Sequence, residues 1–432
     1  MLAALFTTLL IVANPNGAAA ASIDLEAESA ILVDADTGKV LYAKNPDVAL
    51  PPASMTKMMT EYLVLEAIEK GDISWDTTTQ ISDYAYSISA NESFSGVGLI
   101  QDKDYTVRAL NEAMAIPSDN ATTIALAELI AGSEGEFVKL MNQKAEEMGL
   151  PEYKFVNSTG LENKDLGDNY PEGTDPNGTN LLSARSAALL AYHLVNDYPE
   201  VLEISSIPET EFDGQTIRNW NYMLPHEASY LEQFYYEGVD GLKTGFTDLA
   251  GYSFTGTAVR NGQRLITVVM KTDSEEARFQ QTAKLLDHGF DKYETTELFP
   301  EGYQLEGQET IPVSKGKEKE VPVSINEGFA FPIPEGEEAS YTLEYSLDEE
   351  KLNEGGELTA PIEKGEKVGT AKLVYNGEGN DEGYIYGKEM TVDIVTDQAV
   401  EKANWFMLSL SAIGDFFANL FSSAVDWIRG LF

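Results

Sequence analysis

The alternation of apolar and polar positions predicts strands at both ends of the region 22–295, with helices between them. Two apolar stretches flank a turn at residues 36–38, which is typical of a β-hairpin over 30–42. Two further β-rich runs, 251–259 and 264–270, are joined by an Asn-Gly turn. Because these strands lie far apart in the sequence, the pattern predicts an α+β fold whose sheet is closed by non-local pairing.

Helical periodicity predominates between the two groups of strands. A first helix is predicted from Ser54 to about Lys70, ended by Gly71. Serine, glycine and proline residues mark the ends of the others. These predicted helices span residues 107–115, 120–131, 135–148 and 183–196, and a further helix, 274–290, follows the second group of strands.

The chain divides into four predicted segments. Residues 1–21 contain a short apolar run and three small alanines, which indicates an export signal peptide; a buried first helix is the alternative. An α+β domain covers 22–295. Short strands between Gly, Pro and Glu clusters predict a small all-β C-terminal domain over 296–397. Residues 398–432 keep a polar stripe beside an aromatic face, which favours an amphipathic helix lying on a membrane surface over one packed on the β-domain or a partner.

Charge and composition exclude several classes of function. The 432 residues carry a formal net charge of -43, so nucleic acid is an improbable partner. This acidity is typical of a protein adapted to brine or to an alkaline medium. There is no cysteine, and the three histidines (His193, His226 and His288) lack metal-ligand spacing. We therefore expect no metal and no cofactor, and we expect structural histidines rather than a Ser-His-Asp triad.

Ser54 and Lys57 are the first candidates for chemistry. They are three residues apart in Ser-Met-Thr-Lys, so a helix would place the hydroxyl and the amine on one face. Backbone N–H groups at a helix N-terminus can stabilise an oxyanion, and a buried, neutral lysine can act as a base. Alone, this four-residue pattern is weak, because helix capping explains most of its occurrences.

Two other short motifs are equally weak when taken singly. Ser118-Asp119-Asn120 precedes a predicted helix, and an ordinary N-cap is its simplest interpretation. Lys243-Thr244-Gly245 lies at a strand position, where a small residue lets a substrate approach the backbone.

Together, in this order and spacing, the three motifs form the set of serine β-lactamases and penicillin-binding proteins. Several further stretches resemble the low-molecular-mass penicillin-binding proteins of the D-alanyl-D-alanine carboxypeptidase family. The resemblance covers nearly the whole chain after the predicted signal peptide. These stretches are Phe-Val-Asn-Ser-Thr-Gly-Leu at 155–161, Ser-Ala-Arg at 183–185, Asn-Trp-Asn at 219–221, and Val239 to Thr247 followed by Ala-Gly-Tyr-Ser-Phe at 250–254.

The resemblance implies a transpeptidase-type domain, an antiparallel sheet with a helical subdomain. It implies an exported enzyme on the outer face of the bacterial cytoplasmic membrane that removes the terminal D-alanine from peptidoglycan stem peptides and binds β-lactams covalently. The implied catalytic residues are Ser54 as nucleophile, Lys57 as base and Ser118 as proton relay. The implied substrate-binding residues are Asn120, Lys243, Thr244, Gly245, Phe246 and Arg278, with the backbone N–H groups of Ser54 and Phe246 as oxyanion hole.

Three alternatives remain. A serine β-lactamase would need a deacylating base, for which Glu162 and Glu172 are loop candidates. A non-catalytic wall protein that senses β-lactams would keep the pocket without turnover. A glycosidase with two carboxylates is possible in principle, but acids this abundant carry no positional information.

Overall fold

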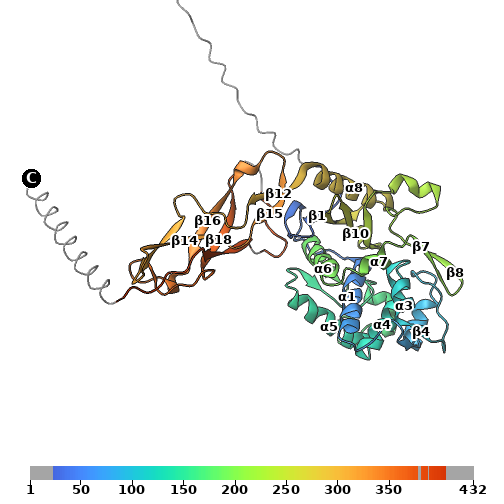
Figure 1. The fold of residues 1–432 in the computed structure, drawn as a ribbon. Coiled ribbons are helices and arrows are strands. Elements are labelled where there is room, and N and C mark those ends of the chain that lie inside the picture. The colour runs from blue at the N-terminus through green and yellow to red at the C-terminus, as the bar shows by residue number, and fades with distance from the viewer. Residues whose placement is uncertain (1–22, 378–380, 388, 405–432) are drawn as a thin grey trace, which may run out of the picture.

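The computed structural model describes residues 23–377, 381–387 and 389–404. Its centre is a five-stranded antiparallel sheet in the order β2-β1-β11-β10-β9 (Figure 1). The α+β class and the non-local pairing are confirmed, because Ser29 of β1 lies opposite Met270 of β11. The strands are β1 (Ser29–Asp34), β2 (Val40–Lys44), β9 (Val239–Thr247), β10 (Gly251–Arg260) and β11 (Gln263–Thr272).

Both faces of this sheet are covered by helices. Successive side chains of a strand point to opposite faces, and β1 is buried along its whole length. Ala30 and Leu32 join the apolar core that includes α8, whereas Ile31 and Val33 join the core that includes α1 and α6. Figure 1 shows α8 on one side of the sheet and α1 and α6 on the other. These helices are α1 (Lys57–Glu69), α6 (Ala184–Asp197) and α8 (Glu275–Lys292).

The helical subdomain lies between β2 and β9 in the chain. The helices predicted at 107–115, 120–131, 135–148, 183–196 and 274–290 begin and end within two residues of those bounds, whereas α1 begins at Lys57 rather than Ser54, and α2 and α7 were not predicted. Side-chain caps explain this agreement, since Ser133, Ser183 and Ser274 each accept a hydrogen bond from a backbone N–H of the following turn. The subdomain contains α2 (Asp83–Ser89), α3 (Val107–Ala115), α4 (Asn120–Ala131), α5 (Glu134–Glu147), α7 (Val201–Ser205) and the short strand pairs β3 (Thr78–Thr79) with β4 (Tyr105–Thr106), β5 (Tyr153–Lys154) with β6 (Leu181–Leu182), and β7 (Glu209–Phe212) with β8 (Gln215–Arg218).

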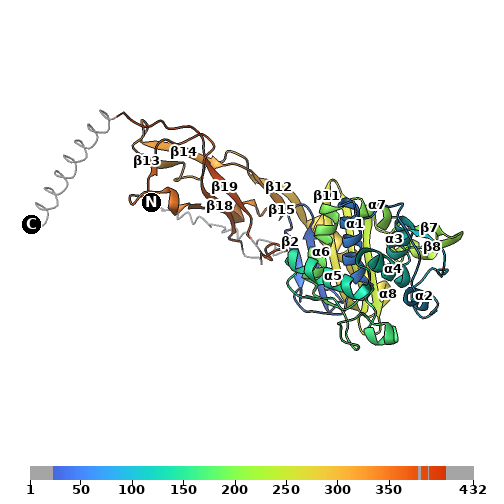
Figure 2. The same ribbon diagram turned by 90° about the horizontal axis from the view of Figure 1, so that it is seen from below.

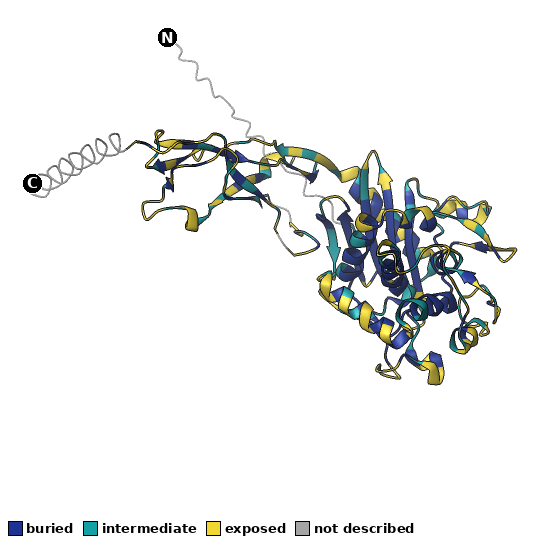
Figure 3. Ribbon diagram, turned by 60° about the horizontal axis from the view of Figure 1, so that its bottom comes forward, coloured by how far each residue is buried: buried dark blue, intermediate teal, exposed yellow. Residues whose placement is uncertain are grey.

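The C-terminal part is an all-β domain, as predicted, and its strands include buried stretches (Figure 3). It has its own apolar core, which includes Phe329, Phe331 and Val368. It consists of a six-stranded sheet, β16-β18-β19-β14-β13-β17, and the pair β12-β15. The strand β12 begins at Tyr293, directly after α8. The strands are β12 (Tyr293–Phe299), β13 (Thr310–Ser314), β14 (Glu320–Ile325), β15 (Phe329–Pro334), β16 (Tyr341–Leu347), β17 (Leu358–Thr359), β18 (Lys367–Tyr375) and β19 (Thr391–Thr396).

A short arm of the β-domain, residues 383–386, contacts the five-stranded sheet at the β1–β2 turn. Ile385 N–H donates to the Gly38 carbonyl (2.8 Å), and Val40 N–H donates to the Gly383 carbonyl (3.0 Å). The ring of Tyr386 meets that of Tyr192 on α6, with centroids 5.7 Å apart. The two lobes in Figure 2 are therefore joined by this arm as well as by the chain from α8 to β12.

The two terminal predictions fall largely outside the described residues. The signal peptide over 1–21 lies wholly outside them, as does the amphipathic helix from 405 onwards. Residues 398–404, expected to begin that helix, are instead extended: Val400 forms an isolated bridge with Ile362, and Ala403 N–H donates to the Lys315 carbonyl (2.8 Å). Among the described residues, no helix is both long enough and apolar enough to cross a membrane.

Candidate active site

Ser54 lies in a single 3-10 turn, η1 (Ala53–Thr56), that leads directly into α1. Ala53 adopts a left-handed φ of 47°, which places this turn close to β9. A Cβ atom at Gly245 would lie 2.4 Å from the carbonyl oxygen of Pro52. We expected a small residue at 245 to let the substrate approach; the structure shows that the turn carrying Ser54 needs this space.

Lys57 is fully enclosed, with 1% of its surface exposed, and its Nζ has three polar neighbours. The Nζ atom lies 3.0 Å from Ser54 Oγ, 2.8 Å from Asn120 Oδ1 and 2.9 Å from the Thr159 carbonyl oxygen. Burial, followed by the nearby charge of Lys243, lowers the pKa of Lys57 well below its usual range. As a neutral amine, Lys57 can donate to Asn120 and Thr159 and direct its lone pair at the Ser54 hydroxyl.

In the second motif, the residue that caps the helix is Asp119 and not Ser118. Asp119 is the N-cap of α4, accepting from Thr122 N–H at 2.6 Å and also from Val97 N–H at 2.6 Å. Ser118 therefore is not the cap: it has a left-handed φ of 64°, and its buried Oγ has no partner among the described residues. Asn120 Nδ2 donates to the Ser95 carbonyl (3.1 Å), which orients Asn120 Oδ1 toward Lys57. An N-cap, Asp119, and a buried serine hydroxyl without a described partner thus lie next to each other in the chain.

The third motif lies on the edge strand β9. Lys243 and Thr244 are buried, at 4% and 6% exposure, and Phe246 is 45% exposed. Phe246 stacks on Tyr252 of β10, with ring centroids 4.2 Å apart. Desolvation lowers the pKa of Lys243 to about 7, Glu61 opposes this shift, and Arg278 adds to it.

Arg278, on the first turn of α8, is buried (3% exposed). Its Nη2 donates to Glu275 Oε1 at 2.9 Å, while its buried Nε–H has no partner among the described residues. The guanidinium lies 5.8 Å from the centroid of the Tyr252 ring, which stacks on Phe246. An unpaired donor on a buried arginine suits a carboxylate ligand.

Sequence reasoning missed the loop at residues 157–160, which contacts Lys57 through the Thr159 carbonyl oxygen. A Cβ at Gly160 would lie 1.8 Å from the Ala53 carbonyl oxygen, so this loop packs directly on the Ser54 turn. Glu134 accepts from both the N–H (2.8 Å) and the hydroxyl (2.6 Å) of Ser158, next to the Thr159 carbonyl that contacts Lys57. The run Asn-Ser-Thr-Gly at 157–160 was noticed only as part of the family resemblance; its three polar residues followed by a glycine were the available signal.

The histidines lie elsewhere. His226 Nε2 is 2.9 Å from the Asn221 carbonyl, His193 Nδ1 is 3.4 Å from Asp197, and His288 packs between Tyr42 and Tyr293.

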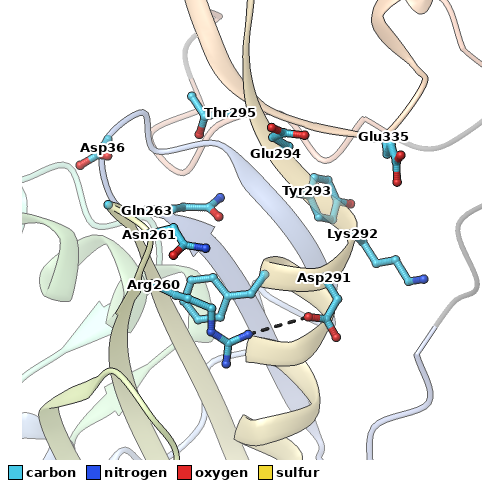
Figure 4. A pocket seen from close by; sticks show the side chains of 12 residues that line it. Asp36, Arg260, Asn261, Gln263, Asp291, Lys292, Tyr293, Glu294, Thr295 and Glu335 are labelled. Atoms are coloured by element: carbon cyan, nitrogen blue, oxygen red, sulfur yellow. Dashed lines mark ion pairs between the residues drawn. The ribbon is translucent and has the colours of Figure 1, made fainter.

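A pocket of about 580 Å³ also lies away from Ser54, at the junction of the two domains (Figure 4). It is bordered by an ion pair between Arg260 and Asp291 (3.8 Å), and none of the predicted site residues lines it.

Comparison with known proteins gives one family match for the α+β domain and another for the β-domain. Residues 15–274 match the family described as D-alanyl-D-alanine carboxypeptidase, and residues 293–402 match the penicillin-binding protein 5 C-terminal domain. D-alanyl-D-alanine carboxypeptidase DacF of Bacillus subtilis is 33% identical over 377 residues, which is 87% of this chain and 89% of the relative.

Solved structures are similar to the same family of proteins. The peptidoglycan synthesis regulatory factor PBP3 of Streptococcus pneumoniae is 36% identical, with a TM-score of 0.69 over 87% of this chain and 100% of that one. Penicillin-binding protein D2 of Listeria monocytogenes in its cefotaxime-bound form is 32% identical, with a TM-score of 0.53 over 62% and 99%. Fold and sequence thus define a serine-type carboxypeptidase of the penicillin-binding class. The chain belongs to the D-alanyl-D-alanine carboxypeptidase family.

Proposed function

We propose that this enzyme removes the terminal D-alanine from peptidoglycan pentapeptide stems through an acyl-enzyme on Ser54. The observation that carries the proposal is the position of Lys57 Nζ, 3.0 Å from Ser54 Oγ and buried, with a lowered pKa. A neutral amine at that distance can take the hydroxyl proton as the oxygen attacks the carbonyl between the two D-alanines. The backbone N–H groups of Ser54 and Phe246 are the proposed oxyanion donors.

Ser118 assists the departure of D-alanine by transferring a proton to it. Its Oγ, buried and without a described partner, can pass the proton from Lys57 to the amine of the leaving D-alanine as the C–N bond breaks. Asn120 holds the substrate amide, while Lys243, Thr244 and Arg278 receive the terminal carboxylate. Water then attacks the ester, Ser54 recovers its proton, and the shortened stem is released.

The same serine is the proposed target of β-lactams, which then act as inhibitors. This inference draws on the cefotaxime-bound relative, whose active-site fold this chain shares. A β-lactamase is the less favoured alternative, because Glu162 forms an ion pair with Lys164 (2.8 Å), and no carboxylate is hydrogen-bonded to the side chain of Ser54, Lys57 or Asn120 within the described residues.

Two assays on one preparation test these proposals. We expect a D-Ala-D-Ala-ended peptide to release D-alanine, and a labelled penicillin to form a long-lived adduct that maps to Ser54. Both should be lost in Ser54→Ala and kept in Ser87→Ala, an exposed serine on α2. Rapid penicillin turnover would instead indicate a β-lactamase, and an adduct without D-alanine release would indicate a sensor.

We also propose that the enzyme is exported and held at the outer face of the cytoplasmic membrane by its C-terminal residues. The polar stripe and aromatic face of the 400–432 segment support this. Because the segment is not basic, binding should depend on apolar burial. The full chain should float with purely zwitterionic vesicles, without any need for anionic lipid, and a chain ending at residue 404 should not float. Flotation of the truncated chain would contradict the proposal.

A further inference from the structure

The run Asn-Trp-Asn at 219–221 has no role in the mechanism above, although it is one of the stretches that resemble the family. Its two asparagines are buried, at 4% and 1% exposure, whereas Trp220 between them keeps 39% of its surface exposed. Buried polar side chains are normally hydrogen-bonded. Here their hydrogen bonds hold the backbone on both sides of one exposed tryptophan.

The asparagine side chains fix this backbone to two elements of the cleft region. Asn219 Nδ2 donates to the carbonyl of Ser205 (3.1 Å), the last residue of α7, and Asn219 Oδ1 accepts from the N–H of Asn221 (2.9 Å). Asn221 Nδ2 donates to the carbonyl of Gly241 (3.4 Å) on β9, the strand that carries the third motif. The position of Trp220 is therefore set by the helical subdomain on one side and by β9 on the other.

The side chain of Trp220 contacts the second motif. Its Nε1–H donates to the Pro117 carbonyl oxygen at 2.8 Å, and Pro117 directly precedes Ser118. At an exposed position water could satisfy an indole N–H equally well, so the tryptophan itself gains little from this hydrogen bond. Its main effect falls on the backbone of the turn that carries Ser118.

Ser118 is the residue of this turn whose conformation needs support. Its φ of 64° is left-handed, which is unfavourable for a residue other than glycine and persists only where the surrounding structure holds it. Its buried Oγ has no hydrogen-bond partner among the described residues, so the backbone must position it. After Ser118, the N–H of Asp119 donates to the Ala113 carbonyl of α3 (2.9 Å). Before Ser118, the contact from Trp220 to Pro117 holds the chain.

We propose that Trp220 is a positioning residue for the reaction proposed above. Its hydrogen bond to Pro117 keeps Ser118 in the conformation from which the hydroxyl passes a proton to the departing D-alanine. The proposal rests on the proposed role of Ser118, which takes a proton from Lys57 and gives one to the amine nitrogen as the bond to the acyl carbon breaks. A displacement of the hydroxyl by about 1 Å would slow the loss of a leaving group that needs this proton and would spare one that does not.

Leaving-group dependence tests the proposal, because a merely structural role would affect every substrate alike. The two substrates are a D-Ala-D-Ala-ended peptide, whose amine must be protonated, and its thioester analogue, whose thiolate leaves without a proton. In Trp220→Phe, which keeps a ring but lacks the N–H, we expect kcat/KM for the peptide to fall by about tenfold or more, and that for the thioester by less than about twofold. Trp75→Phe, the same substitution at the other described tryptophan, should change neither value.

A double variant identifies Ser118 as the group that responds. Ser118→Ala should lower kcat/KM for the peptide far more than for the thioester, and adding Trp220→Phe should then cause no further selective loss, because the hydroxyl is already absent. Equal losses on both substrates in Trp220→Phe, no loss at all, or a further selective loss in the double variant would each overturn the proposal. Trp220→Leu also lacks the donor and replaces Trp220→Phe if that variant does not fold.

The same measurements separate this proposal from the proposed function. Absence of D-alanine release from the wild-type enzyme would overturn the function and the role of Trp220 together. Equal losses on both substrates in Ser118→Ala would overturn the proton relay and, with it, the role of Trp220. A selective loss in Ser118→Ala without one in Trp220→Phe would leave the function in place and overturn the role of Trp220 alone.

Discussion

The active-site cleft and the β-domain use charged residues in opposite ways. In the β-domain, ion pairs such as Lys367–Asp393 (2.6 Å) and Lys351–Glu366 (3.4 Å) leave both side chains more than a third exposed. In the cleft, Lys57 and Lys243 are almost completely buried, and neither forms an ion pair within the described residues. Water screens the first group, whereas the second is controlled by desolvation and by a few oriented dipoles.

The difference separates the few buried charged groups that can take part in proton transfer from the many exposed ones that cannot. Of its 101 charged side chains (72 acidic and 29 basic), most serve a surface that carries the net charge of -43. A substitution in the cleft should therefore alter proton transfer, while the same kind of substitution in the β-domain should alter almost nothing. The following predictions test this contrast, beginning with the largest effect.

Replacing Lys57 with methionine should reduce acylation of Ser54 by about 10²–10⁴-fold, the usual contribution of a general base. The pH dependence of the wild-type enzyme should show the cause. Because the neutral amine is the active form and burial lowers the pKa of Lys57, acylation should rise with pH and reach its maximum well below pH 10.5, the usual lysine pKa. Stopped-flow penicillin acylation measures both. A maximum reached only near that usual value would contradict a buried, neutral base.

Replacing Gly160 with alanine should unfold the turn that carries Ser54 or displace it. The φ of Gly160 is +90°, and the new Cβ would lie 1.8 Å from the Ala53 carbonyl oxygen and 3.0 Å from Ser54 N. Strain and overpacking together should cost about 3 kcal/mol or more. Gly149→Ala is the matched control: its φ is +70°, but its Cβ would meet nothing within 4 Å. It should lose only about 1–2 kcal/mol and retain full activity in denaturant and turnover assays.

The active-site residues also show how much could be predicted from the sequence. Most of the helix ends were predictable because capping signals are contained within a few residues, whereas Ser54 and Lys57 became candidates only when three motifs far apart in the sequence were taken together. The environment of Lys57 was not predictable, since Thr159 lies 102 positions away in sequence and contacts it only through folding. Glu134 is one acid among 72 Asp and Glu, so nothing local distinguishes it from surface residues. Its contact with Ser158 depends on burial, which is a property of the tertiary structure.

Salt should increase activity by a moderate factor. A substrate with a free carboxylate is repelled at long range by a protein of charge -43, and only the buried cations of the cleft attract it. Raising ionic strength from about 0.1 to 1 M shortens the Debye length from about 10 to 3 Å, which screens the surface more than the cleft. We expect kcat/KM for the peptide to rise severalfold, with kcat less affected. A flat or falling profile, in enzyme whose melting temperature does not change, would reject this explanation.

The smallest effect should come from the β-domain. Lys367→Met removes the ion pair with Asp393, but the two side chains are 47% and 40% exposed, so water already solvates both. We expect the melting temperature to change by no more than about 1 °C and D-alanine release to match the wild type. This substitution is chemically the same as Lys57→Met in the cleft, so the pair isolates burial as the variable. A comparable loss of activity at both positions would mean that the β-domain acts on the cleft through its charges, and the contrast drawn above would fail.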